Sequence, residues 1–124
     1  MNGNDNILVD TNLFIYYFDG INSAKQALSG KKIHFSFITE IELLGTGRIS
    51  NAQEKMIKEV LSFQTKYSYS PEIEKITIAI KKAQKIKIPD AIIAATAIVN
   101  EIPLLTSDKA FGRIKDLRCI VFEV

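Results

Sequence analysis

The segment Ile7-Leu8-Val9-Asp10-Thr11-Asn12 decides how this chain folds. Its three aliphatic residues, two of them β-branched, form the short apolar run that is typical of a strand buried on both faces. The run stops at Asp10. In parallel α/β sheets, ligands bind outside the carboxyl ends of the strands, which makes Asp10 a candidate site residue. Its carboxylate could equally serve only to cap the helix that follows.

Outward from this segment, apolar patterns of strand and helix type alternate along the chain. This alternation predicts an α/β fold of three layers, α/β/α, around a mainly parallel sheet with right-handed crossovers. No repeat or linker divides the chain, so residues 1–124 are expected to form a single domain. Besides 7–10, the predicted strands are 33–38, 66–70, 104–106 and 120–122, and the predicted helices are 12–19, 22–29, 39–45, 51–63, 72–85, 91–100 and 110–114.

The composition favours a globular protein with one core over a membrane or secreted protein. The 124 residues are 47% hydrophobic, which is ample for one core. Apolar runs are far shorter than the roughly 20 residues that cross a bilayer, and the polar amino terminus lacks the basic start of a signal peptide. The single cysteine, Cys119, lies in a strand-like run and is expected to be a buried apolar residue. We therefore expect a cytoplasmic protein without a membrane partner.

Three further acids lie at comparable junctions of the predicted elements. Glu42 and Asp90 lie at the starts of helices, and Asp108 lies just after the strand 104–106. Because strand carboxyl ends share one edge of a parallel sheet, all four acids can converge there. Each also has a local explanation: Thr39-x-x-Glu42 matches a capping box, and an acid at a helix start is favoured by the helix dipole.

Clustered carboxylates repel one another, and divalent cations relieve that repulsion. Oxygen ligands without nearby Cys or His favour Mg²⁺ or Mn²⁺ over zinc, and the single histidine, His34, falls within a predicted strand. A cation held in this way lowers the pKa of a bound water and holds phosphate oxygens for attack. The pattern thus indicates hydrolysis of a phosphate ester, and no glycine-rich phosphate loop is present.

Positive charge is concentrated in one part of the chain. The net charge is only +2, but residues 75–87 hold five lysines and no acid. A basic surface beside an acidic pocket suits a polyanion that meets metal ions in the pocket. An ordinary solvated helix face accounts for the lysines about as well.

Taken together, these motifs resemble the PIN-domain ribonucleases, specifically the small VapC-type toxins of bacterial toxin–antitoxin pairs. The resemblance covers nearly the whole chain, in the family's order and spacing. It rests on residues 9–15 (Val-Asp-Thr-Asn-Leu-Phe-Ile), 38–45 (Ile-Thr-Glu-Ile-Glu-Leu-Leu-Gly), 88–97 (Ile-Pro-Asp-Ala-Ile-Ile-Ala-Ala-Thr-Ala) and 104–111 (Leu-Leu-Thr-Ser-Asp-Lys-Ala-Phe).

The resemblance implies a PIN-like fold with a metal site built from acids. Asp10 and Asp90 would be the principal Mg²⁺ (or Mn²⁺) ligands. Glu42 would complete the site or position the water, with Glu40 as its rival. Asp108 would hold a second ion or act through water.

The resemblance also assigns supporting residues and partners. Asn12 and Thr106 would hold the site by hydrogen bonds. Lys81, Lys82 and Lys85 are the candidate contacts to RNA. The family's activity is endonucleolytic cleavage of RNA, often structured RNA such as tRNA, by a homodimer that a cognate antitoxin neutralises. The aromatic segment 14–18 could contact a partner or belong to the core.

Alternatives from other classes remain at this point. A phosphatase of the haloacid dehalogenase type needs a second Asp where this chain has Asn12, and a receiver domain needs an acidic pair that is absent. A PIN fold that binds RNA or protein without cutting it has the same sequence pattern, because retained carboxylates do not prove catalysis.

Overall fold

A five-stranded sheet forms the centre of the computed structural model, which describes residues 5–123. All neighbouring strands are parallel, in the order β3-β2-β1-β4-β5, as the alternation of elements predicted. β1 is therefore central, with Leu8 opposite both His34 and Leu104. The strands are β1 Asn6–Val9, β2 Lys32–Ser36, β3 Thr65–Tyr67, β4 Leu104–Thr106 and β5 Cys119–Val121.

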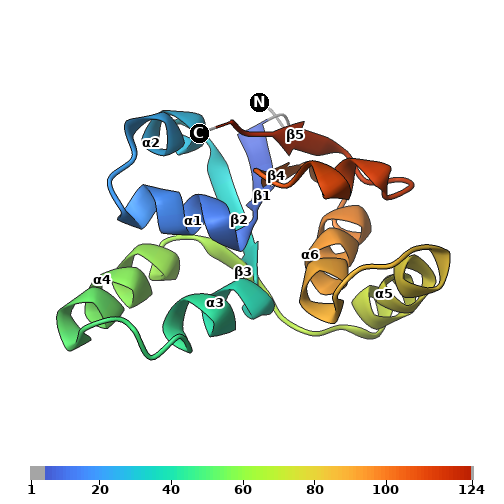
Figure 1. Ribbon diagram of the computed structural model, residues 1–124, viewed down its shortest axis with the longest axis horizontal. Helices are drawn as coiled ribbons and strands as arrows, with labels where there is room; N and C mark the ends of the chain where they lie inside the picture. Colours follow the sequence, from blue (N-terminus) through green and yellow to red (C-terminus); the bar gives the residue numbers. More distant parts are fainter. Residues whose placement is uncertain (1–4, 124) are drawn as a thin grey trace.

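Helices cover both faces of this sheet and complete the predicted three layers (Figure 1). Figure 1 shows α1 to α4 on one side and α5 with α6 on the other. The helices are α1 Thr11–Phe18, α2 Asn22–Leu28, α3 Phe37–Leu44, α4 Asn51–Ser62, α5 Pro71–Ala83, α6 Ile88–Val99 and the short 3₁₀ helix η2 Lys109–Arg113. None of the helices in the described part of the chain has the length and apolar character needed to cross a membrane.

Alternation along β1 produces two hydrophobic cores. Ile7 and Val9 pack on the side of α1 to α4, and Leu8 packs on the side of α5 and α6. All three are at most 2% exposed, which agrees with a strand buried on both faces. The apolar helix α6 lies in the second core with nearly every side covered, as its Ala- and Ile-rich sequence predicted.

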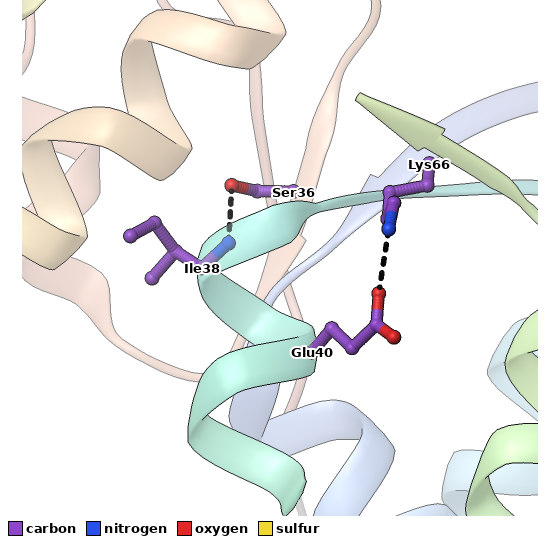
Figure 2. Close-up of polar contacts among 4 residues, drawn as sticks. All are labelled: Ser36, Ile38, Glu40 and Lys66. Carbon is purple, nitrogen blue, oxygen red and sulfur yellow. Dashed lines mark hydrogen bonds and ion pairs between the residues drawn. The ribbon is translucent and has the colours of Figure 1, made fainter. Parts of the chain in front are cut away.

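The start of α3 differs from the sequence prediction. β2 ends at Ser36, two residues earlier than predicted, and the Ser36 hydroxyl caps α3 by accepting from the Ile38 amide at 3.1 Å (Figure 2). The predicted capping box Thr39-x-x-Glu42 is therefore wrong. Thr39 lies inside the helix and is fully buried, because the turn begins at Phe37.

The starts of two other helices, α4 and α6, show how their first turns are stabilised. α4 begins at Asn51, as predicted, and Ser50 caps it, because Ser50 and Gln53 form a complete capping box with each other's backbone amides. α6 begins at Ile88 rather than Ala91, with Pro89 in its first turn, where a missing amide proton has no cost.

Burial in α6 predicts a clear difference between two isoleucines of the same helix. Ile93 is 1% exposed and Ile88 is 59% exposed. We expect Ile93→Ala to lower the free energy of unfolding by about 2–5 kcal/mol, because it leaves a cavity in the second core. Ile88→Ala should change it by no more than about 0.5 kcal/mol. Urea unfolding followed by circular dichroism measures both, and equal effects would contradict the burial of α6.

Candidate active site

Four acids from four different elements line one pocket at the carboxyl edge of the sheet. This pocket, called the acid pocket below, has a volume of about 320 Å³. Asp10 directly follows β1, Asp108 follows β4, Glu42 lies on α3 and Asp90 lies in the first turn of α6. The parallel sheet thus brings together residues that are nearly one hundred positions apart. The residues that line the acid pocket are Asp10, Thr11, Asn12, Ile15, Glu42, Lys87, Pro89, Asp90, Asp108 and Phe111.

Asp10 is the most deeply placed of the four, with 5% of its surface exposed. One carboxylate oxygen accepts from the Thr11 amide at 2.8 Å, so Asp10 does cap α1. The other oxygen accepts from the Thr106 hydroxyl of β4 at 2.7 Å. Asp10 therefore both caps α1 and lines the acid pocket, because the capping hydrogen bond fixes the orientation of its carboxylate.

Glu42 is held by Thr11, a residue that the sequence analysis did not single out. The Thr11 hydroxyl donates to Glu42 Oε1 at 2.6 Å, and its oxygen lies 3.0 Å from the Thr39 hydroxyl oxygen. A hydroxyl has one proton, so Thr11 donates to Glu42 while accepting from Thr39. The position of Thr11 between Asp10 and Asn12 was the available signal, but its partner on α3 could not be read from the sequence.

Glu40, the rival for the role of Glu42, points elsewhere. Its carboxylate forms an ion pair with Lys66 of β3 at 3.1 Å, which Figure 2 shows beside the start of α3. Residues two apart on a helix lie on different faces, so one of the two glutamates can reach the pocket. That residue is Glu42.

Burial and mutual repulsion raise the pKa of two of these acids. Burial raises the pKa of Asp10 above its ordinary value, the Thr106 and Thr11 hydrogen bonds lower it, and the charges of Asp90 and Glu42 raise it again. For Asp90, burial and then the charges of Glu42 and Asp108 raise the pKa, while Lys87 lowers it. The acid pocket thus favours uptake of positive charge, whether as protons or as a cation.

The donor set fits a hard divalent cation in its chemistry, since every candidate ligand is a carboxylate oxygen. Within residues 5–123, however, no three Asp, Glu, His or Cys side chains are already close enough to hold a metal ion together. Asp108 lies at the exposed rim, where it caps η2 by accepting from the Ala110 amide at 2.9 Å. Mg²⁺ commonly binds through one or two carboxylates and completes its coordination with water.

The other predicted site residues lie in different places. Asn12 lines the acid pocket and Thr106 holds Asp10. Lys81, Lys82 and Lys85 are exposed and lie outside the pocket lining, at the end of α5 and in the loop after it. The lysine in the lining is Lys87, which was counted in the basic run but was not assigned a role.

His34 and Cys119 are not part of the pocket lining. The imidazole of His34 forms a 2.9 Å hydrogen bond with Asn6 and stacks on Tyr67, and burial lowers its pKa, which keeps it neutral at pH 7. Cys119 is half-buried in β5 rather than fully buried. Burial, and then the charges of Asp10 and Asp108, raise the pKa of its thiol.

A larger groove adjoins the acid pocket. It has a volume of about 580 Å³, lies between α1, α3 and α4, and shares Ile15 and Glu42 with the acid pocket. Most of its surface is apolar, and Phe18 of the aromatic segment lines it. Phe14 of that segment instead belongs to the first core.

Comparisons with known proteins identify the family of this chain. A family model of the PIN domain matches residues 7–117. A search of curated proteins gave no significant match. Among solved structures, a chain of a toxin–antitoxin complex from Klebsiella pneumoniae is 32% identical, with a TM-score of 0.84 over 95% of this chain and 99% of that one.

Two further structures have the same fold. A chain of VapBC-1 from nontypeable Haemophilus influenzae is 25% identical, with a TM-score of 0.76 over 94% of this chain and 97% of that one. A chain of VapBC2 from Rickettsia felis, bound to a promoter DNA fragment, is 20% identical, with a TM-score of 0.82 over 95% and 99%. The resemblance to VapC-type proteins that the motifs indicated is thus confirmed, and this chain belongs to the PIN domain family.

Proposed function

We propose that this protein is a metal-dependent endoribonuclease and that it acts as the toxin of a VapBC-type toxin–antitoxin pair. The observation that supports it most is the convergence of Asp10, Glu42, Asp90 and Asp108 on one pocket of a PIN domain. The reaction is the attack of water on a phosphodiester of RNA. The cofactor we propose is Mg²⁺, which Mn²⁺ can replace.

The four acids have different proposed roles in binding the cation. Asp10, Asp90 and Glu42 are the proposed ligands, and Asp108 at the rim holds a second ion or acts through water. A bound divalent ion makes its water more acidic and draws charge from the phosphate oxygens. The hydrogen bonds of Thr106 and Thr11 orient the carboxylates of Asp10 and Glu42 before any ligand binds. Such preorganisation reduces the motion that the reaction requires.

The partners we propose are an RNA substrate, a cognate antitoxin and a second copy of this chain in a homodimer. The antitoxin is supported by the Klebsiella pneumoniae relative, which comes from a toxin–antitoxin complex. The apolar groove beside the acid pocket offers a place for a peptide segment, since it shares Ile15 and Glu42 with that pocket.

The two glutamates of α3 supply a matched pair of variants. We expect Glu42→Gln to lower the rate of RNA cleavage by about 100-fold or more, because it removes the charge of one proposed metal ligand. Glu40→Gln should leave cleavage near the wild-type rate, since Glu40 pairs with Lys66 outside the acid pocket. Cleavage of total cellular RNA with Mg²⁺ and with EDTA tests this. A larger loss in Glu40→Gln than in Glu42→Gln would reverse the assignment.

Metal binding should appear in thermal unfolding. Manganese ion at about 100 times its dissociation constant adds about 2.7 kcal/mol to the stability of the folded state. We expect a smaller gain for Asp90→Asn, which removes a ligand charge. A melting temperature that does not respond to Mn²⁺ would leave the non-catalytic binding module as the function of this PIN domain.

The same measurement has a defined pH dependence. The pKa of Asp10 and Asp90 lies above the ordinary 3.8, so their contribution to metal-free stability is present at low pH and is lost as the pH rises through those raised values. Protons compete with the metal in this range. The stabilisation by Mn²⁺ should therefore be largest at neutral pH and should decrease as the pH falls toward 4. A constant gain across this range would contradict metal binding by these two acids.

The exposed lysines in the last turn of α5 and in the loop after it are the proposed contacts to the RNA that flanks the cleavage site. Replacing Lys81, Lys82 and Lys85 with Ala should reduce the slope of log affinity against log salt by about 0.7 for each lost phosphate contact with single-stranded RNA. The cleavage rate at saturating RNA should change little, since these lysines lie outside the pocket lining. Filter binding at several salt concentrations measures the slope, and an unchanged slope would place the RNA on another face.

A further inference from the structure

Lys87 is an exposed lysine that lines the acid pocket. It is the residue that precedes α6, and its backbone oxygen accepts from the Ala91 amide at 2.9 Å. Pro89 in the first turn restricts the backbone of Ile88, the residue that follows Lys87. The side chain of Lys87 therefore starts from the same helix end as the carboxylate of Asp90, and both line the pocket.

The charge of Lys87 is not committed to an acid of the protein. Among the described residues that line the acid pocket, it is the one with a positive charge. The ion pairs found within residues 5–123 join Lys58 to Glu54, Lys66 to Glu40 and Lys109 to Glu123, and Lys87 is in none of them. Its ammonium group is thus close enough to influence Asp90 but is available to a ligand.

An RNA phosphate that enters this pocket meets four carboxylates. One divalent cation offsets only part of that negative charge, so a further positive charge beside the pocket favours binding of the phosphate. Lysine binds phosphate oxygens as a point charge, without the fixed geometry that arginine requires. Because negative charge increases on the phosphate as water attacks, such a contact is stronger in the transition state than in the bound substrate.

The neighbouring lysines do not have this position. Lys81 donates to the backbone oxygen of Ile86 at 2.6 Å, which ties the end of α5 to the following loop. Lys82 and Lys85 are exposed on the outer surface. The basic run therefore contains two kinds of lysine, with Lys87 facing the acids and the others outside the pocket lining.

We propose that the Lys87 ammonium group contacts a non-bridging oxygen of the RNA phosphate that is cleaved in the acid pocket. This makes Lys87 a catalytic residue as well as a binding residue. The inference rests on the proposed ribonuclease function. It identifies Lys87 as the residue that supplies positive charge from the protein to the phosphate during cleavage.

Three variants test this role: Lys87→Gln, Lys87→Arg and Lys25→Gln. Lys25 is an exposed lysine of α2, which lies across the sheet from α6, and serves as the control. Lys87→Gln should lower the cleavage rate at saturating RNA by about 10-fold or more, and it should reduce the salt slope of RNA binding by about 0.7. Lys87→Arg should recover most of both quantities, and Lys25→Gln should match the wild type.

A metal titration separates this role from a structural one. Removing a positive charge beside the carboxylates should leave Mn²⁺ binding by Lys87→Gln as tight as in the wild type, or tighter. Weaker Mn²⁺ binding together with an unchanged salt slope would mean that Lys87 only shapes the site, and would overturn the inference. If Lys87→Gln cleaves and binds RNA as well as the wild type does, the inference is overturned as well. A wild-type protein that neither binds nor cleaves RNA would overturn the proposed function and this inference together.

Discussion

The carboxylate of Asp10 is a charged group in a nearly closed environment, and the surrounding structure is arranged to tolerate it. Burial of an ionised carboxylate is unfavourable unless hydrogen bonds compensate for the lost water. Here the compensation comes from the Thr11 amide at the start of α1 and from the Thr106 hydroxyl at the end of β4. The Thr11 donor is local, whereas the Thr106 donor depends on the parallel pairing of β1 with β4, which places Val9 opposite Leu105. The geometry of the site is thus a direct result of strand order.

The hydrogen bonds of the pocket form a connected set around Thr11. Its amide orients Asp10, its hydroxyl orients Glu42, and Thr39 supports that hydroxyl from α3. Two acids from different elements are thereby linked through one small residue. A threonine is suited to this task because its hydroxyl can donate and accept at once, and because its branched side chain has few conformations.

The parts of the fold that follow from periodicity were predictable from the sequence, and the parts that depend on side-chain direction were not. The apolar run 7–9 gives the central strand, and the Ala-rich segment gives the buried α6, because both need cover on all sides. The start of α3 was placed too late, since Phe37 and Ile38 continue the apolar pattern of β2 although Ser36 already caps the helix.

The choice between Glu40 and Glu42 depended on motif alignment, and only the ion pair with Lys66 shows where Glu40 points. The position of Lys87 required the helix start at Ile88, which the sequence analysis placed three residues later.

Strand order also determines when, during synthesis, the pocket can exist. β1 and β4 are neighbours in the sheet, yet the hydrogen bond between Asp10 and Thr106 joins residues 96 positions apart. Contacts of such large sequence separation form late, because a long segment of chain must be ordered before they are made. A nascent chain that has emerged only as far as α5 contains Asp10 and Glu42 but has neither Asp90 nor the strand that orients Asp10. Pocket assembly therefore requires synthesis to continue through β4, and a translation product that stops at α5 lacks the complete set of acids.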